Sequence, residues 1–325
     1  MIILESIFFI LIGFVLLIKG ADFFVDGAVG IAKKFGIPSI IIGLTVVAFG
    51  TSAPELAVSI SAAMNGVNDM AVGNVVGSNL FNLLVVLGLS AVVKPVIVDK
   101  GVLKRDYPLS IVAVMTLGLF CLDGVLASGK EKISIYRWEG VILLALFALF
   151  MYLTIHGALK SRESQVEIAE EVNKEPLPLW KSLVYCGLGL AGIIIGGNIT
   201  VEWAKKLAGE LGMSDALIGL TIAAVGTSLP ELVTSVVAAK KGESDIALGN
   251  VVGSNIFNVF LILGVSFVIM PMQIAMTYVY DIVILLLASV IFFIPIASKK
   301  KVGRGVGAAS FICYVAYMVY ICIRG

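Results

Sequence analysis

Residues 43–82 read GLTVVAFGTSAPELAVSISAAMNGVNDMAVGNVVGSNLFN, and residues 219–258 read GLTIAAVGTSLPELVTSVVAAKKGESDIALGNVVGSNIFN. The two stretches lie 176 positions apart, align without a gap and are identical at 25 of 40 positions. The identities include Thr, Ser, Pro, Glu and Asn, whereas chance similarity between apolar helices gives only scattered Leu and Val matches. Self-similarity at a fixed offset predicts that the chain is a duplication of one structural unit.

The two copies lie in an unusually apolar chain. Of its 325 residues, 59% are hydrophobic and 14% are charged, whereas a soluble domain carries about 25% charged residues. Apolar runs of the ~20 residues that a membrane helix needs occur along nearly the whole length. We therefore predict an all-α integral membrane protein whose main surroundings are the lipid bilayer. The net charge of +1 is uninformative, but no basic tract suggests a nucleic-acid partner, and no obligate protein partner is evident.

Ten membrane helices are predicted, five in each copy. They lie near residues 3–32, 38–64, 70–94, 107–123, 137–157, 180–209, 214–239, 245–270, 276–297 and 303–323. This divides the chain into a first five-helix repeat at 1–157, a polar loop at 158–179 and a second five-helix repeat at 180–325. Because five is odd, the second copy enters the membrane from the opposite side. Such inverted-topology repeats are typical of secondary transporters, whose substrates bind at the repeat interface near the midplane.

Lysine and arginine positions predict the orientation, because they are enriched in cytoplasmic segments. With the N-terminus outside, sixteen of the 23 Lys and Arg residues fall on the inner side and six on the outer side, and Lys19 lies within the first helix. We therefore expect a multi-pass protein of the cell membrane with extracellular N- and C-termini. The loop at 158–179 is then cytoplasmic.

Each copy carries one glutamate near the middle of its second helix, Glu55 in the first copy and Glu231 in the second. A charge at the bilayer centre costs at least ~2.5–3.5 kcal/mol on insertion scales. Lys19 is the one basic residue at a comparable depth, so a protonated or lysine-bridged pair is the alternative to a functional site. Repeat-equivalent glutamates would meet near a pseudo-two-fold axis, which favours a cation site.

The residues around each glutamate can add neutral oxygen ligands. Both glutamates end the motif Gly-Thr-Ser-x-Pro-Glu, at 50–55 and 226–231. The proline removes a backbone donor and clashes with the carbonyl four residues earlier, and the break exposes carbonyl oxygens inside the membrane. The motif also supplies four hydroxyls, those of Thr51, Ser52, Thr227 and Ser228. An all-oxygen site of this kind suits Ca²⁺ and Na⁺ rather than zinc or copper.

The third and eighth helices carry Gly-Asn-Val-Val-Gly-Ser-Asn-x-Phe-Asn, at 73–82 and 249–258. The glycine spacing is typical of close helix packing. Polar side chains recur every four residues and so share one face of each helix: Asn74, Ser78, Asn82, Asn250, Ser254 and Asn258. We expect these faces to point at the broken helices and to add neutral ligands. The site then holds two formal negative charges. One Ca²⁺ neutralises them, whereas a larger number of Na⁺ would bring more positive charge than the site can balance.

Two copies of GTSxPE followed by GNVVGSNxFN resemble the alpha repeats of the sodium/calcium exchangers, of the prokaryotic type, in the cation/calcium antiporter superfamily. The resemblance covers essentially the whole chain. It implies an antiporter rather than an enzyme, without catalytic residues and without a cofactor besides the transported Ca²⁺ and Na⁺. It also implies that the first and sixth helices slide as the gate.

The resemblance further implies a role for each residue of the site. Ca²⁺ would bind the carboxylates of Glu55 and Glu231 and the backbone oxygens of Thr51 and Thr227. Sodium positions would use these residues together with the hydroxyls and carbonyls of Ser52, Ser78, Ser228, Ser254, Ala48 and Ala224. Asn82 and Asn258 would line the middle of the site.

Comparison with two other branches of the superfamily narrows the range of ions that we expect to be transported. The potassium-dependent branch carries an aspartate at the position matching Asn258, as do some prokaryotic relatives outside that branch. Both copies here have asparagine, which argues against K⁺ co-transport. A Ca²⁺/H⁺ antiporter using the same glutamates stays open as an alternative, although calcium/proton relatives usually place an additional glutamate on the third and eighth helices. A channel, which would conduct without a counter-ion, fits less well. An intramembrane hydrolase also fits less well, since no serine–lysine or paired-aspartate constellation supports it.

Overall fold

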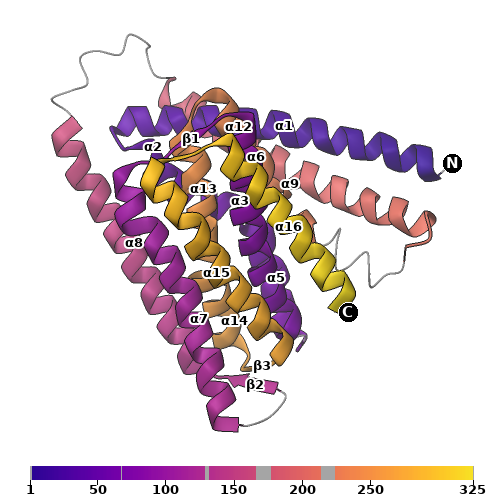
Figure 1. The fold of residues 1–325 in the computed structure, drawn as a ribbon. Coiled ribbons are helices and arrows are strands. Elements are labelled where there is room, and N and C mark those ends of the chain that lie inside the picture. The colour runs from indigo at the N-terminus through magenta and orange to yellow at the C-terminus, as the bar shows by residue number, and fades with distance from the viewer. Residues whose placement is uncertain (1, 67, 129–131, 166–176, 214–223, 325) are drawn as a thin grey trace.

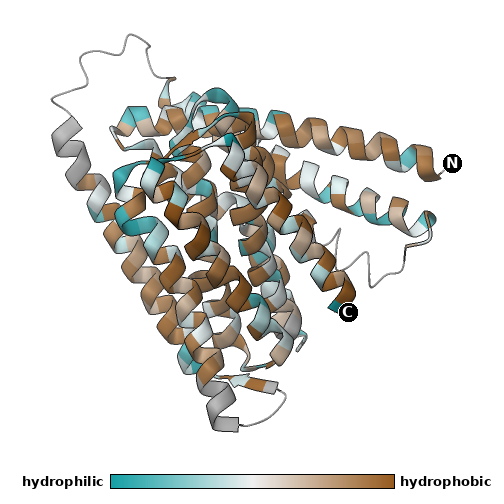
Figure 2. Cartoon of the chain, in the orientation of Figure 1, coloured by the Kyte–Doolittle hydropathy of each residue, from teal (hydrophilic) through white to brown (hydrophobic). Residues whose placement is uncertain are grey.

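The structure, a computed structural model, describes residues 2–66, 68–128, 132–165, 177–213 and 224–324 (Figure 1). Within these ranges eight helices are long and apolar enough to cross a membrane, and a ninth span results if a pair bent by 48° counts as one. Figure 2 shows brown, apolar residues along most of these helices. The predicted all-α membrane class is therefore confirmed. The predicted count of ten is not fully tested, because residues 214–223 of the expected seventh helix lie outside the described ranges.

The first copy begins with α1 (Ile2–Phe35) and the bent pair, in which α2 (Ser39–Ile42), a π-helical turn at 43–47 and α3 (Ala48–Thr51) lead into α4 (Ala53–Met64). The third span joins α5 (Asn68–Phe81), a π-helical turn at 82–86 and α6 (Leu87–Val93). A π-helical turn at 102–106 opens α7 (Tyr107–Ser128), and α8 (Arg137–Gln165) follows. The predicted fifth membrane helix at 137–157 coincides with the apolar span Arg137–Gly157 of α8, and the helix itself continues to Gln165. Residues 158–165 lack Gly and Pro, so a polar helix continues past the apolar span.

The second copy follows the same order in its described residues. It comprises α9 (Leu179–Glu210), α11 (Ala224–Thr227), α12 (Leu229–Lys241), α13 (Ser244–Ile256), a π-helical segment at 257–263, α14 (Gly264–Ile269), α15 (Met276–Lys299) and α16 (Arg304–Arg324). The spans built from α5–α6 and α13–α14 are mostly buried, whereas only a minority of the residues in the spans of α1, α8, α15 and α16 are buried. The motif-bearing helices thus form the centre, and the other helices surround them.

Two short antiparallel ribbons, which the sequence patterns do not predict, link the copies. β1 (Val96–Ile97) pairs with β4 (Lys301–Val302), and β2 (Lys132–Ile135) pairs with β3 (Met272–Ala275). In each ribbon one strand comes from each copy. Strands of two to four residues are too short for a period-two signal, so their pairing depends on the helices that bring them together.

Helices α1 and α9 pack along each other and are strongly inclined to the other helices (Figure 1). Their contact is made by glycines. A methyl group on Gly20 would lie 2.7 Å from the backbone nitrogen of Ile193, and one on Gly189 would lie 2.7 Å from the carbonyl oxygen of Gly20. The two backbones therefore touch, as at other small-residue contacts between membrane helices.

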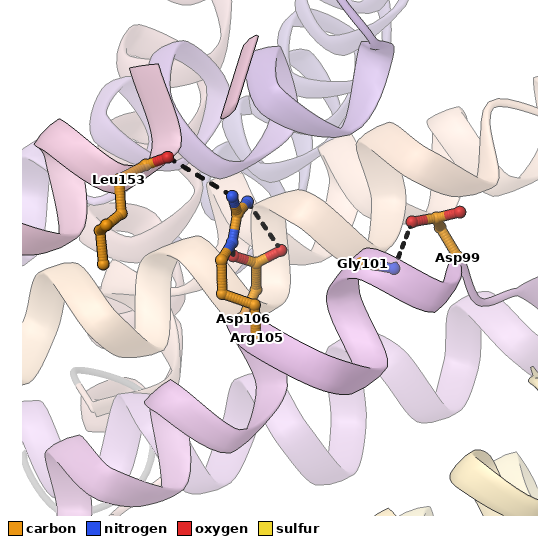
Figure 3. A network of polar contacts seen from close by, with 5 residues as sticks. All are labelled: Asp99, Gly101, Arg105, Asp106 and Leu153. Atoms are coloured by element: carbon orange, nitrogen blue, oxygen red, sulfur yellow. Dashed lines mark hydrogen bonds and ion pairs between the residues drawn. The ribbon is translucent and has the colours of Figure 1, made fainter. Parts of the chain in front are cut away.

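A polar network fixes the start of α7 (Figure 3). The Asp99 carboxylate accepts a hydrogen bond from the backbone nitrogen of Gly101 at 2.6 Å. The Arg105 guanidinium pairs with the buried carboxylate of Asp106 at 2.7 Å and reaches the Leu153 carbonyl of α8 at 3.5 Å. These contacts connect α7 to α8 at the end that the charge distribution predicts to be cytoplasmic.

Candidate cation-binding site

Glu55 and Glu231 converge in the interior, and neither side chain is exposed. The Ser228 hydroxyl donates a hydrogen bond to Glu55 Oε1 at 2.9 Å. The Ser52 hydroxyl donates to Glu231 Oε1, also at 2.9 Å. Since each serine lies three residues before the glutamate of its own copy, each carboxylate is held by the segment that carries the other one.

Breaks in the helices place the two glutamates. Ser52 and Ser228 leave the helical conformation, with ψ angles of 6° and 7°, and stand between α3 and α4 and between α11 and α12. Pro54 and Pro230 occupy the first turns that follow, where a missing backbone N–H costs nothing. Each glutamate also lies in such a first turn, where the helix dipole favours negative charge. The predicted break before each glutamate is confirmed.

Several oxygen atoms around the glutamates have no hydrogen-bond partner among the described residues. They are all buried: Glu55 Oε2, Glu231 Oε2, Asn82 Oδ1, Asn258 Oδ1 and Ser254 Oγ. A buried polar atom without a partner costs about 1–3 kcal/mol, so these atoms fit a positively charged ligand that the chain itself does not supply. Carboxylate, amide and hydroxyl oxygens are the ligands of hard cations. No group of three or more His, Cys, Asp or Glu side chains that could hold a metal ion occurs in the described part of the chain.

The remaining predicted site residues lie in the same region. Those that are fully or almost fully buried are Ala48, Thr51, Ser52, Ser78, Asn82, Ser228, Ser254 and Asn258. The Ser78 hydroxyl lies 3.0 Å from that of Ser228. Thr227 is half-buried, and Ala224 begins α11.

Four polar residues near the site were missed by the sequence reasoning. Ser59 and Ser235 accept hydrogen bonds from the amides of Asn74 and Asn250, at 3.1 and 2.9 Å. Asn79 and Asn255 donate to each other's backbone carbonyls, at 3.2 and 3.4 Å. Asn79 also accepts from the Asn258 amide at 2.9 Å. All four are identical in the two copies, and that repetition was the signal that could have identified them.

A cavity of about 760 Å³ leads to one side of the site. Its lining includes Asn74 and Thr227 next to the glutamates, and Glu202 and Arg324 near the ends of α9 and α16. The glutamates themselves do not line it. The cavity therefore extends from the helix ends that the charge distribution predicts to be extracellular to the edge of the buried site.

The chain matches the family model described as sodium/calcium exchanger protein over residues 5–156 and 181–323. It belongs to the sodium/calcium exchanger family. It is 39% identical over 321 residues to the putative antiporter CaxA of Alkalimonas amylolytica, across 97% of this chain and 98% of that protein. It is 34% identical over 339 residues to the sodium/calcium exchanger MaX1 of Methanosarcina acetivorans, across 96% and 97% of the two chains.

A solved structure of the sodium-calcium exchanger NCX_Mj superposes on this fold with a TM-score of 0.82, at 31% identity and across 98% of this chain and 99% of that one. The family resemblance drawn from the two motifs is thus confirmed. Exchanger-family proteins are multi-pass antiporters of Na⁺ and Ca²⁺ and not enzymes, which confirms the predicted class.

Proposed function

We propose that this exchanger carries Ca²⁺ in one direction and Na⁺ in the other, by alternating access to the buried site between Glu55 and Glu231. The observation that carries the proposal is the reciprocal bonding of Ser52 to Glu231 and of Ser228 to Glu55. These hydrogen bonds hold the two carboxylates together away from solvent. One oxygen of each carboxylate has no hydrogen-bond partner among the described residues. A divalent cation balances this pair of charges.

In the proposed site, Ca²⁺ binds both carboxylates and the backbone oxygens of Thr51 and Thr227. Na⁺ binds at positions that share these residues and add the oxygens of Ser52, Ser78, Ser228, Ser254, Ala48 and Ala224, with Asn82 and Asn258 in the middle. Because the carboxylates carry two negative charges, exchange of one Ca²⁺ for more than two Na⁺ moves net charge. Each charge moved across the membrane is worth about 2.3 kcal/mol per 100 mV.

The proposed architecture is two inverted five-helix repeats, 1–157 and 180–325, joined by a cytoplasmic loop, with both termini extracellular. The reciprocal hydrogen bonds and the exchanged strand pairs support it, since each of these contacts from the first copy to the second has a counterpart in the other direction. In this orientation the cavity opens to the outside. Movement of the packed pair α1 and α9 would close it and open the opposite side.

Proteoliposomes that contain the purified full chain test the proposal. Ca²⁺ uptake is expected to follow an outward Na⁺ gradient, to persist when a protonophore collapses the pH gradient, and to respond to membrane potential set with valinomycin and K⁺. The Glu55→Gln variant serves as the inactive control. Uptake that follows a pH gradient and ignores the Na⁺ gradient would instead establish Ca²⁺/H⁺ exchange.

A further inference from the structure

Asn250 of α13 joins the two copies through a fully buried amide. Its nitrogen donates hydrogen bonds to the Ser235 hydroxyl at 2.9 Å and to the Glu231 backbone carbonyl at 3.4 Å. Its oxygen accepts the Thr51 hydroxyl of the other copy at 2.9 Å. The amide oxygen is thus already engaged by a protein donor, which does not suit the expected role as a cation ligand.

Besides the Glu231 carboxylate, the Thr51 hydroxyl has three acceptors within reach. They are Asn250 Oδ1 at 2.9 Å and the carbonyls of Val47 at 3.1 Å and Ala48 at 3.3 Å. A hydroxyl carries one hydrogen, and threonine in a helix ordinarily gives it to a carbonyl of the preceding turn. The Asn250 oxygen is the closest of the three. When Asn250 Oδ1 accepts the hydrogen bond from the Thr51 hydroxyl, the Ala48 carbonyl keeps a lone pair that this hydroxyl does not occupy.

We propose that Asn250, and Asn74 in the other copy, are positioning residues of the cation site and not ligands. Each draws the threonine hydroxyl of the opposite copy away from the carbonyls of its own helix, and each anchors that threonine to the backbone of a glutamate. The carbonyls next to the helix break stay available to the cation. This inference rests on the proposed function, because it assigns roles toward the same Ca²⁺ site.

The Asn74 arrangement has the same partners at longer distances. Thr227 donates to Asn74 Oδ1 at 3.4 Å, and the Asn74 amide reaches Ser59 at 3.1 Å and the Glu55 carbonyl at 3.5 Å. Asn74 is half-buried and lines the cavity, whereas Asn250 is fully buried. In this conformation the hydrogen bonds of Asn250 are the shorter ones. Loss of the Asn250 hydrogen bonds should therefore weaken Ca²⁺ binding more than loss of the Asn74 hydrogen bonds.

A double-mutant cycle tests the assignment. Equilibrium Ca²⁺ binding is measured by calorimetry on the purified full chain for Thr51→Val, Asn250→Leu and the double variant. We expect each single variant to weaken Ca²⁺ binding about tenfold, and the double variant to bind no more weakly than the weaker single one, since either change already removes the shared hydrogen bond. The Thr227→Val and Asn74→Leu cycle should show the same coupling with smaller changes.

The controls separate this inference from its alternatives. Asn65→Leu changes an exposed asparagine at the end of α4 and should leave Ca²⁺ affinity unchanged. Each melting temperature is recorded, and Asn250→Thr, which is too short to reach Thr51, replaces Asn250→Leu if the latter does not fold. Additive losses in the double variant, as expected for an independent ligand, or unchanged affinity in either single variant, would overturn the assignment. Because binding needs no Na⁺ gradient, failure of Na⁺ coupling alone leaves this result unaffected.

Discussion

The two copies share the residues of the site but differ in the charges beside their inclined helices. In the first copy Asp22 and Asp26 of α1 pair with Lys241, at the end of α12, at 3.0 and 2.7 Å. The positions 176 residues away from these three are Asn198, Glu202 and Asn65. Asn65 cannot form an ion pair.

The second copy therefore lacks this connection between its inclined helix and the core. Glu202 pairs instead with Lys206 of its own helix at 2.8 Å, and Asn198 and Glu202 line the cavity. Ion pairs thus connect the inclined helix to the core at one end of the molecule, and the cavity lies at the equivalent end. The comparison teaches that a duplicated sequence can repeat the residues of the candidate site while it differs in the charges that connect the inclined helices to the core.

The largest expected effect comes from removing the negative charge of one of the two half-sites. Glu55→Gln and Glu231→Gln each remove one of the two charges that balance Ca²⁺, so either change should abolish Na⁺-driven Ca²⁺ uptake in proteoliposomes. Ser61→Ala, on the exposed side of α4, is the matched control and should keep wild-type uptake. Substantial exchange in either glutamine variant would contradict a site shared by both copies.

The contact between α1 and α9 should be the next most sensitive. Gly189→Leu places a side chain against the backbone of Gly20, and overpacking of this kind costs about 1–3 kcal/mol. We expect a lower melting temperature and reduced transport. Gly187→Leu is the control on the same helix, because a Cβ there meets no atom within 4 Å. Equal effects at the two positions would show that close packing of the two helices is not required.

Removal of the charged connection should have a moderate effect. Lys241→Gln breaks two partly exposed ion pairs, each worth about 0–1 kcal/mol, and a shift of this size changes the ratio of two conformations a few-fold. We expect slower labelling of a cysteine introduced at Val201 in the cavity, measured with a thiol reagent added from outside. Lys206→Gln breaks the ion pair within α9 and serves as the control. Unchanged labelling in Lys241→Gln would mean that Lys241 does not favour the conformation with the open cavity.

The smallest expected effect is that of potassium. Since both copies carry asparagine at 82 and 258, the site lacks the third carboxylate that K⁺ co-transport would use, and replacing K⁺ by choline should leave the initial rate of Ca²⁺ uptake unchanged. Asn258→Asp is the informative companion, because it adds that charge. A rate that falls to background without K⁺ in the wild-type chain would contradict K⁺ independence.

Much of the fold and of the candidate site could be predicted from the sequence. Apolar runs located the spans, and the proline placed the helix breaks before Glu55 and Glu231, because both signals are local. Identity between the copies indicated that the glutamates would meet. The ribbons and the pairing of Lys241 with Asp22 could not be predicted, since they depend on segments that only the packed helices bring together. The contacts of Asn250 could not be predicted for the same reason: its helix face follows from the spacing of the motif, but its hydrogen bond with the Thr51 hydroxyl of the other copy does not.

The central claim is that two acidic side chains from the two copies bind one cation between them. A high-resolution experimental structure of the full chain with bound Ca²⁺ tests it most directly. The account predicts a single Ca²⁺ in contact with carboxylate oxygens of both Glu55 and Glu231, at about 2.3–2.6 Å. A Ca²⁺ bound elsewhere, or held by only one of the two carboxylates, would contradict it.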